Sequence, residues 1–324
     1  MNEPTRRHRL DGLEPDNLLA FLALLGSLRA IEASRLAWRS RVAWDVEQPP
    51  LRPVLLLAEA ATREEISEAV AEGANRLADV YEFPAEDAEI ATQKDLNYSA
   101  RYARALLSKT AAQDNRERAD LWAALFSDMA ARDGRIEPTP LCLLFGQGHQ
   151  HFLDRLATVP RTEAPPPRGR SRRAITLSPA QTIAEALFEP WTREDPTPGF
   201  RWDPAEDVRY ALRADDPSGE KATTQHGANR LAALGLPVFT AVPVERGGRV
   251  RLQVLAGHLE REFSLAWPIW REPATLAGIR ALLSHPDLLA GAAALRHLGV
   301  EQVRRTRRIS NGRFNNFARA EVIG

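Results

Sequence analysis

Residues 10–32, LDGLEPDNLLAFLALLGSLRAIE, decide how this chain begins to fold. Gly12, Pro15 and Asp16 favour a turn, and the uncharged run Leu18–Leu28 follows it directly. Apolar residues recur in that run at the spacing of one helix face, and further leucines lie off that face. We therefore predict a core helix that is covered on most sides. The run is shorter than the ~20 apolar residues that a membrane span needs, so no membrane association is expected.

The composition is that of a folded protein rather than a disordered one. Of 324 residues, 44% are hydrophobic, which suffices for a core in one large domain or two closely packed ones. The single cysteine, Cys142, excludes an internal disulfide and a multi-cysteine metal site. Together with the lack of a recognisable signal peptide, it predicts a cytoplasmic protein.

The order of the expected elements favours an α+β fold. The N-terminal half reads as mainly helical, with a capping box at Thr62–Glu65 opening one of its helices. From Pro237 onward apolar residues alternate, and Gly247-Gly248 predicts a turn between two antiparallel strands of a meander. We divide the chain into a mainly helical region (1–160), a Pro/Arg-rich linker or arm (161–177) and an α+β region with a basic C-terminal hairpin (178–324).

The charge is balanced overall but unusual in kind. The formal net charge is zero, so the chain as a whole lacks the basic character of a nucleic-acid coat protein. Of the 43 cationic residues, however, three are lysines (Lys94, Lys109 and Lys221), which leaves 43 − 3 = 40 arginines. A GC-rich genome explains this excess of arginine over lysine. The alternative is selection for the planar guanidinium, which binds phosphate with two parallel donors. Only local clusters of arginine can support the second explanation.

One cluster lies in the arm. Three consecutive prolines (Pro165–Pro167) and Gly169 disfavour helix and strand there. We expect an exposed segment whose arginines lie in water: Arg168, Arg170, Arg172 and Arg173. It is either a solvated connector or a mobile arm that follows a nucleic-acid backbone.

The second cluster is at the C-terminus, VRRTRRISNGRFNNFARAEVIG. A strand over Val303–Ser310 would place Arg305 and Arg307 on one face and Arg304 and Arg308 on the other. Asn311-Gly312 predicts a two-residue hairpin turn, after which the chain pairs back. Guanidinium and amide groups interleaved with rings are typical of nucleic-acid grooves. The candidate nucleic-acid-binding residues are Arg304, Arg305, Arg307, Arg308, Arg313, Phe314 and Asn315; in the alternative, the arginines pair with Asp and Glu of the same fold.

Polar residues elsewhere give weaker signals. The run KATTQHGANR and the segment FGQGHQHF could supply a donor-rich pocket for a phosphate or a base edge, formed by Lys221, Thr223, Thr224, Gln225, His226, His149 and His151. Neither run has the Walker or the dinucleotide-binding pattern. His149 and His151 could hold a metal with Asp154 or Asp203, although no complete ligand spacing is present. Residues 191–218 read as a long ordered loop, with a catalytic carboxylate pair among Asp203, Glu206 and Asp207 as the alternative.

Four stretches resemble a protein family encoded with type I-G (formerly I-U) CRISPR systems, related to or working with the large subunit and the helicase–nuclease. They are GLEPDNLLAFLALLGSLRAIE, RIEPTPLCLLFGQGHQHFLDRL, PTPGFRWDPAEDVRYALRADDPS and KATTQHGANRLAALGLPV. The resemblance implies a non-enzymatic antiviral effector subunit without a cofactor. Its implied partners are other effector subunits and guide RNA or target DNA, where base pairing reads sequence and protein holds the backbone. A metal-dependent hydrolase or nuclease using His149 and His151, and a scaffold that binds only protein, are the alternatives.

Overall fold

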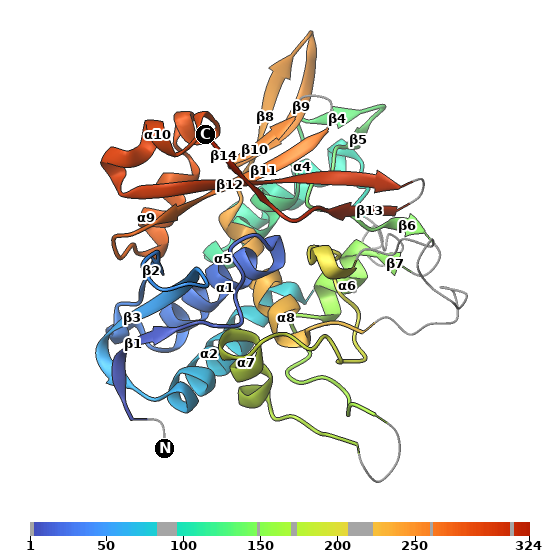
Figure 1. Cartoon of the computed structure of the whole chain (residues 1–324). Coiled ribbons are helices and arrows are strands. Elements are labelled where there is room, and N and C mark those ends of the chain that lie inside the picture. The colour runs from blue at the N-terminus through green and yellow to red at the C-terminus, as the bar shows by residue number, and fades with distance from the viewer. Residues whose placement is uncertain are drawn as a thin grey trace.

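Two helices, α1 (Leu18–Ser34) and α8 (His226–Gly235), cross at the centre of the fold (Figure 1). The structure is a computed structural model of the chain, and it describes residues 3–82, 96–147, 150–169, 174–206, 223–259, 262–311 and 314–324. The side chain of Asn17 caps α1 by accepting hydrogen bonds from the N–H groups of Leu19 (2.9 Å) and Ala20 (3.4 Å). Every residue of the run Leu18–Leu28 is buried, which confirms the predicted core helix.

Two glycines allow these helices to touch backbone to backbone. A Cβ atom on Gly26 of α1 would overlap the carbonyl oxygen of Leu231, and one on Gly235 of α8 would overlap that of Leu22. All ten residues of α8 are buried as a result, its polar ones included. The other described elements are arranged around this crossing.

Two further helices lie beside the crossing, on the side away from the large sheet (Figure 1). Helix α2 (Arg63–Ala78) opens with the predicted capping box, in which Thr62 Oγ1 accepts from Glu65 N–H (3.1 Å) and Glu65 Oε2 from Thr62 N–H (2.7 Å). Helix α7 (Pro179–Phe188) opens with a second capping box, from Ser178 to Gln181. Their apolar faces are buried against α1 and α8, so the four helices form one layer.

A small antiparallel sheet precedes and follows α1. Its strand order is β1-β3-β2, with β1 (Thr5–Arg9), β2 (Arg41–Asp45) and β3 (Arg52–Ala61). The N-terminal half therefore contains a sheet as well as helices. The central strand β3 shows little alternation between buried and exposed residues, because Pro53, Val54 and Leu55 are all buried beneath the neighbouring elements.

The large C-terminal sheet covers the other side of α1. Its order is β10-β11-β12-β13, and β14 also pairs with β12; the bounds are β10 Gly257–Leu259, β11 Phe263–Trp270, β12 Val300–Asn311, β13 Phe314–Phe317 and β14 Glu321–Ile323. Trp267 of β11 stacks on Phe21 of α1 with ring centroids 5.2 Å apart, and its Nε1–H donates to the Pro15 carbonyl oxygen (3.1 Å). Val300 and Val303 pack with Leu288 and Leu295 on the opposite face. The sheet is thus buried on both faces around Trp267 of β11 and Val303 of β12.

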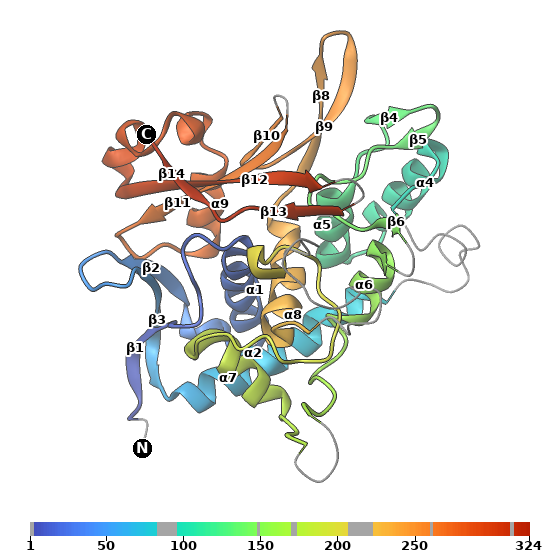
Figure 2. The same cartoon turned by 45° about the vertical axis from the view of Figure 1, so that its right-hand side comes forward.

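The remaining elements flank or connect these layers (Figure 2). They are η1 Leu36–Trp38, η2 Asp79–Tyr81, α4 Ala100–Ala111, α5 Arg116–Leu125, β4 Ala131–Arg132, β5 Arg135–Ile136, β6 Phe145–Gln147, β7 Gln150–His151, α6 Phe152–Thr158, η4 Pro204–Glu206, η6 Leu236–Val238, β8 Ala241–Arg246, β9 Arg249–Val254, α9 Leu276–Leu283, η7 Pro286–Ala290, α10 Ala292–Leu295 and η8 Arg296–Leu298. Strands β8 and β9 pair across Gly247-Gly248 as predicted, and they project from the body in both views.

The α+β class is confirmed, with antiparallel sheets and a C-terminal hairpin. One hydrophobic cluster runs from Leu10 to Ala320 and draws residues from both regions that flank the arm. The regions 1–160 and 178–324 therefore share a core. None of the described helices has the length and hydropathy needed to cross a bilayer.

The contact between α1 and α8 generates a stability prediction. Gly26→Ala should lower the free energy of unfolding by about 3 kcal/mol or more, because the added methyl group meets a backbone carbonyl that cannot rotate away. Gly278→Ala in α9 is the matched control: its Cβ would lie 3.6 Å from the nearest atoms, so a helical alanine there should be neutral or stabilising. Urea unfolding checks both, and an unchanged midpoint for Gly26→Ala would contradict the packing described.

Candidate nucleic-acid interface

The arginine-rich strand β12 is the spine of the C-terminal sheet. It pairs with β11 along one edge and with β13 and β14 along the other, so its backbone is held on both sides. The register places Arg304 opposite Trp267 and Arg305 opposite Ala266. Because side chains alternate along a strand, Arg304 and Arg308 lie on the face that meets α1, and Arg305 and Arg307 on the other. This is the predicted division of the arginines between two faces.

One carboxylate serves the two arginines on the outer face. Glu321 of β14 lies 2.7 Å from a guanidinium nitrogen of Arg307 and 3.5 Å from one of Arg305. The side chain of Arg307 is 55% exposed, so this pair is a solvated one and contributes little to stability. Two positive charges here share a single negative one.

The two arginines on the inner face have no carboxylate within ion-pair distance among the described residues. Arg304 Nη2 donates to the side-chain oxygen of Gln302 (2.9 Å), and its Nε has no partner. Partial burial lowers the pKa of the Arg304 guanidinium, although the Asp16 carboxylate opposes that shift. Burial likewise lowers the pKa of Arg308, against the weaker opposing effects of Cys142 and Glu262. Both are partly desolvated cations without a neutralising contact.

The predicted hairpin at the end of β12 is present. Strand β13 pairs back in a register that sets Ser310 opposite Asn315 and Arg308 opposite Phe317. Phe317 is buried and meets Phe263 edge-on, so this ring belongs to the core, whereas Asn315 remains half-buried at the surface. Arg313 lies outside the described residues, and of Phe314 the structure describes only the backbone pairing. Arg319 pairs with Glu14 and Asp16 (both 3.0 Å) and is neutralised within the fold.

Arg168 does not lie in water, contrary to the prediction. Its backbone pairs with Ile175 (2.9 and 3.0 Å), which closes the base of the arm. Its Nε donates to Asp195 (2.7 Å), and Nη1 and Nη2 donate to the two oxygens of Glu185 on α7 (3.3 and 2.6 Å). Burial opposes the charge, but the hydrogen bonds to Asp195 and Glu185 outweigh it and raise the pKa. Arg168 is therefore a structural anchor. Arg170, Arg172 and Arg173 lie outside the described residues.

The predicted polar pocket is a buried network at the start of α8 instead. Thr224, Gln225 and His226 are each no more than 2% exposed and bond to the chain itself. Gln225 accepts from Arg193 N–H (3.2 Å), and His226 Nε2 donates to the Thr162 carbonyl oxygen (2.8 Å). Burial lowers the pKa of His226, which favours the neutral imidazole. Thr223 is exposed, and His151 precedes α6 as its N-cap residue. Lys221 and His149 lie outside the described residues.

Two neighbouring carboxyls, the buried Asp203 and the half-buried Glu206, lie next to this network. Asp203 accepts hydrogen bonds from Arg193 Nε (2.7 Å) and from Asn17 Nδ2 (3.0 Å), which joins the segment to the cap of α1. Glu206 Oε2 accepts from Arg201 N–H (3.2 Å), and its Oε1 has no partner. Burial, with Asp203 nearby, raises the pKa of Glu206 to about 8.

Two arginines beside the pair have positive φ angles, Arg193 at 59° and Arg201 at 63°, so the backbone is strained where it turns the carboxyls inward. The only sequence signal for this site was the density of Pro, Trp, Asp and Arg over residues 191–218. Asp207, in the same segment, lies outside the described residues.

Across the part of the chain that the structure describes, no three His, Cys, Asp or Glu residues come together to hold a metal. Asp203 is already occupied by donors, and Asp154 is exposed on α6.

Comparison of the chain with protein-family models, with curated proteins and with solved structures found no match.

The carboxyl group of Glu206 generates a pH prediction. Its pKa of about 8 in the fold exceeds the ~4.3 of an unfolded chain, so the folded state binds an extra proton between these values. Its contribution to stability is complete below about pH 4 and is lost as pH rises through about 8. Glu206→Gln should therefore unfold several degrees above the unsubstituted protein at pH 9 and at nearly the same temperature at pH 5.

Thermal unfolding across this pH range makes the measurement, with Glu59→Gln as the exposed control. An unchanged difference between Glu206→Gln and the unsubstituted protein from pH 5 to pH 9 would contradict the burial of a protonated carboxyl.

Proposed function

We propose that this chain is a non-catalytic subunit that binds the phosphate backbone of a nucleic acid through β12. On the resemblance of its four stretches, we further propose that it does so in a type I-G CRISPR effector, beside guide RNA and target DNA. The observation that carries the proposal is the charge of one strand. Arg304, Arg305, Arg307 and Arg308 share a single carboxylate in ion-pair contact, Glu321, within the described chain.

The spacing of these arginines supports a backbone contact. Residues i and i+2 of a strand lie ~6.8 Å apart on the same face, which is close to the separation of neighbouring phosphates in an extended strand. Arg305 and Arg307 have this spacing on one face. On the other face Arg304 and Arg308 lie four residues apart, about twice that distance, with the buried Thr306 between them. Because β12 is paired on both edges, it presents the guanidiniums from a rigid backbone and loses little entropy on binding.

Partial desolvation of Arg304 and Arg308 favours an anionic partner. A guanidinium that has lost water without gaining a carboxylate is unfavourable in the free protein, and a phosphate oxygen restores the missing charge-assisted hydrogen bonds. Carboxylates on an acidic face of a partner protein would supply the same hydrogen bonds. This is the alternative in which the chain is a scaffold that binds only protein.

The proposal predicts that Arg304→Gln/Arg308→Gln weakens binding to single-stranded RNA or DNA at least tenfold. Each lost phosphate contact should also reduce the slope of log K against log salt by ~0.7. The matched control is Arg271→Gln/Arg296→Gln, which removes two exposed charges from the α10 end of the sheet. Fluorescence anisotropy over a salt series checks the prediction, and equal affinity and slope for both double variants would contradict it.

The assembly is tested separately by native mass spectrometry of complexes purified through this chain. We expect the chain to travel with guide RNA and effector subunits, and nuclease treatment to release it from the nucleic acid. Co-purification with protein alone, unaffected by nuclease, would favour the scaffold and contradict the proposed role.

A further inference from the structure

The β8–β9 hairpin stands away from the body and is a sheet of its own. In both views the two strands extend beyond the neighbouring elements (Figures 1 and 2), and within the described chain neither strand pairs with a third. Only its root is fixed in the core, by Ala241, Leu252 and Val254. The distal half, with Arg246 and Arg249 beside the Gly247-Gly248 turn, is exposed.

One face of the hairpin carries all of its arginines. The register sets Arg246 opposite Arg249, Val244 opposite Arg251 and Val242 opposite Gln253, and such directly paired residues share a face. Its single acidic residue, Glu245, lies on the other face, opposite Val250. Like charges directly opposite each other destabilise a strand pair, so the Arg246–Arg249 pair is unfavourable unless an anion lies against it.

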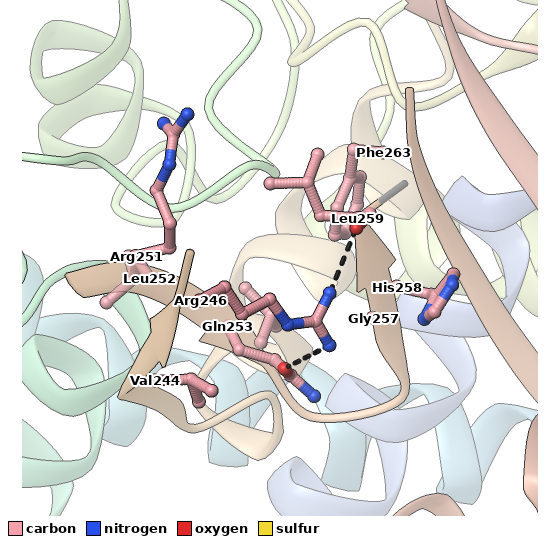
Figure 3. A pocket seen from close by; sticks show the side chains of 10 residues that line it. Val244, Arg246, Arg251, Leu252, Gln253, Gly257, His258, Leu259 and Phe263 are labelled. Atoms are coloured by element: carbon pink, nitrogen blue, oxygen red, sulfur yellow. Dashed lines mark hydrogen bonds between the residues drawn. The ribbon is translucent and has the colours of Figure 1, made fainter. Parts of the chain in front are cut away.

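The contacts of these arginines leave the face positive. Arg251 pairs with Glu137 (3.0 Å). Arg246 donates to the Leu259 carbonyl oxygen (3.0 Å) and to the side-chain oxygen of Gln253 (3.2 Å), and neither group bears a charge (Figure 3). Arg249 has no carboxylate in contact among the residues that the structure describes. Three guanidiniums therefore face one carboxylate.

A small recess lies between this face of the hairpin and β10. Arg246, Arg251 and His258 line it (Figure 3). The Arg246 side chain crosses the recess, and its hydrogen bond to the Leu259 carbonyl oxygen ties the hairpin to β10. Val242, on the same face, is 47% exposed, which supplies an apolar contact next to the charges.

We propose that the β8–β9 hairpin inserts this basic face into the major groove of double-stranded DNA. The inference rests on the proposed function and adds the duplex as a second ligand. A two-stranded ribbon has strands ~4.8 Å apart and, with side chains, fits the ~12 Å width of the major groove of B-DNA. The major groove of A-form RNA is too narrow and deep for it. In the major groove an arginine donates hydrogen bonds to guanine O6 and N7, and an exposed valine makes an apolar contact with the thymine methyl group.

The test compares duplex and single-stranded DNA of one sequence. Arg246→Gln/Arg249→Gln should weaken duplex binding at least tenfold and single-strand binding less than twofold, because β12 is intact. Its unfolding temperature should change little, because the like-charge pair is removed while the exposed hydrogen bonds of Arg246 to Leu259 and Gln253 are lost. Glu245→Gln, on the opposite face, is the control and should bind the duplex at least as well as the unsubstituted protein.

A duplex in which 7-deazaguanine replaces guanine distinguishes the grooves, since it lacks the N7 acceptor of the major groove only. The unsubstituted protein should bind it several-fold more weakly than the ordinary duplex, and Arg246→Gln/Arg249→Gln should not distinguish the two. Equal duplex affinity for the hairpin variant and the unsubstituted protein would overturn this inference while leaving β12 binding intact. Equally tight binding of an RNA duplex would also overturn it, and failure of the protein to bind single strands would instead remove the proposed function.

Discussion

The structure depends on the backbone contact between α1 and α8 that Gly26 and Gly235 permit. Because these helices touch without intervening side chains, α8 is wholly enclosed and its polar residues must bond within the fold. The same contact fixes the position of α1. Phe21 of α1 in turn stacks against Trp267 and so positions β11. Strand β12 is paired with β11, so the position of its arginines is set from the core outward. The arginines of β12 are thus held in place by the centre of the molecule.

Arginines of this chain fall into two physical groups. Arg168 and Arg193 are bound by the buried carboxylates Asp195 and Asp203, and their role is to fix long loops on the helical layer. Those of β12 are only partly matched, since two share Glu321 and two contact no carboxylate in the described ranges. Arginine content alone cannot separate the groups. What separates them is whether the fold brings a carboxylate to each guanidinium, and the second group has charge available for a ligand.

Local sequence signals predicted the elements that short-range physics determines. The uncharged run of α1, the Thr62–Glu65 capping box and the turn at Gly247-Gly248 all lie where the sequence indicates. Strands β12 and β13 form the predicted hairpin, with Asn311 paired to Phe314 in the ladder. Predictions that depend on long-range contacts were less successful. Exposure of Arg168 was inferred from its proline-rich neighbours, but the carboxylates that bury it come 17 and 27 residues later. The raised pKa of Glu206 had no local signal in the sequence, because it depends on burial that only the folded chain supplies.

The central claim is that β12 presents unneutralised guanidiniums to a nucleic-acid backbone. Ultraviolet crosslinking of the protein to single-stranded RNA and DNA, followed by mass spectrometry of the adducts, tests it most directly. The account predicts nucleotide adducts concentrated in the C-terminal segment from Val300 to Gly324, lost when salt is raised. Adducts confined to other parts of the chain, with none in that segment, would contradict it.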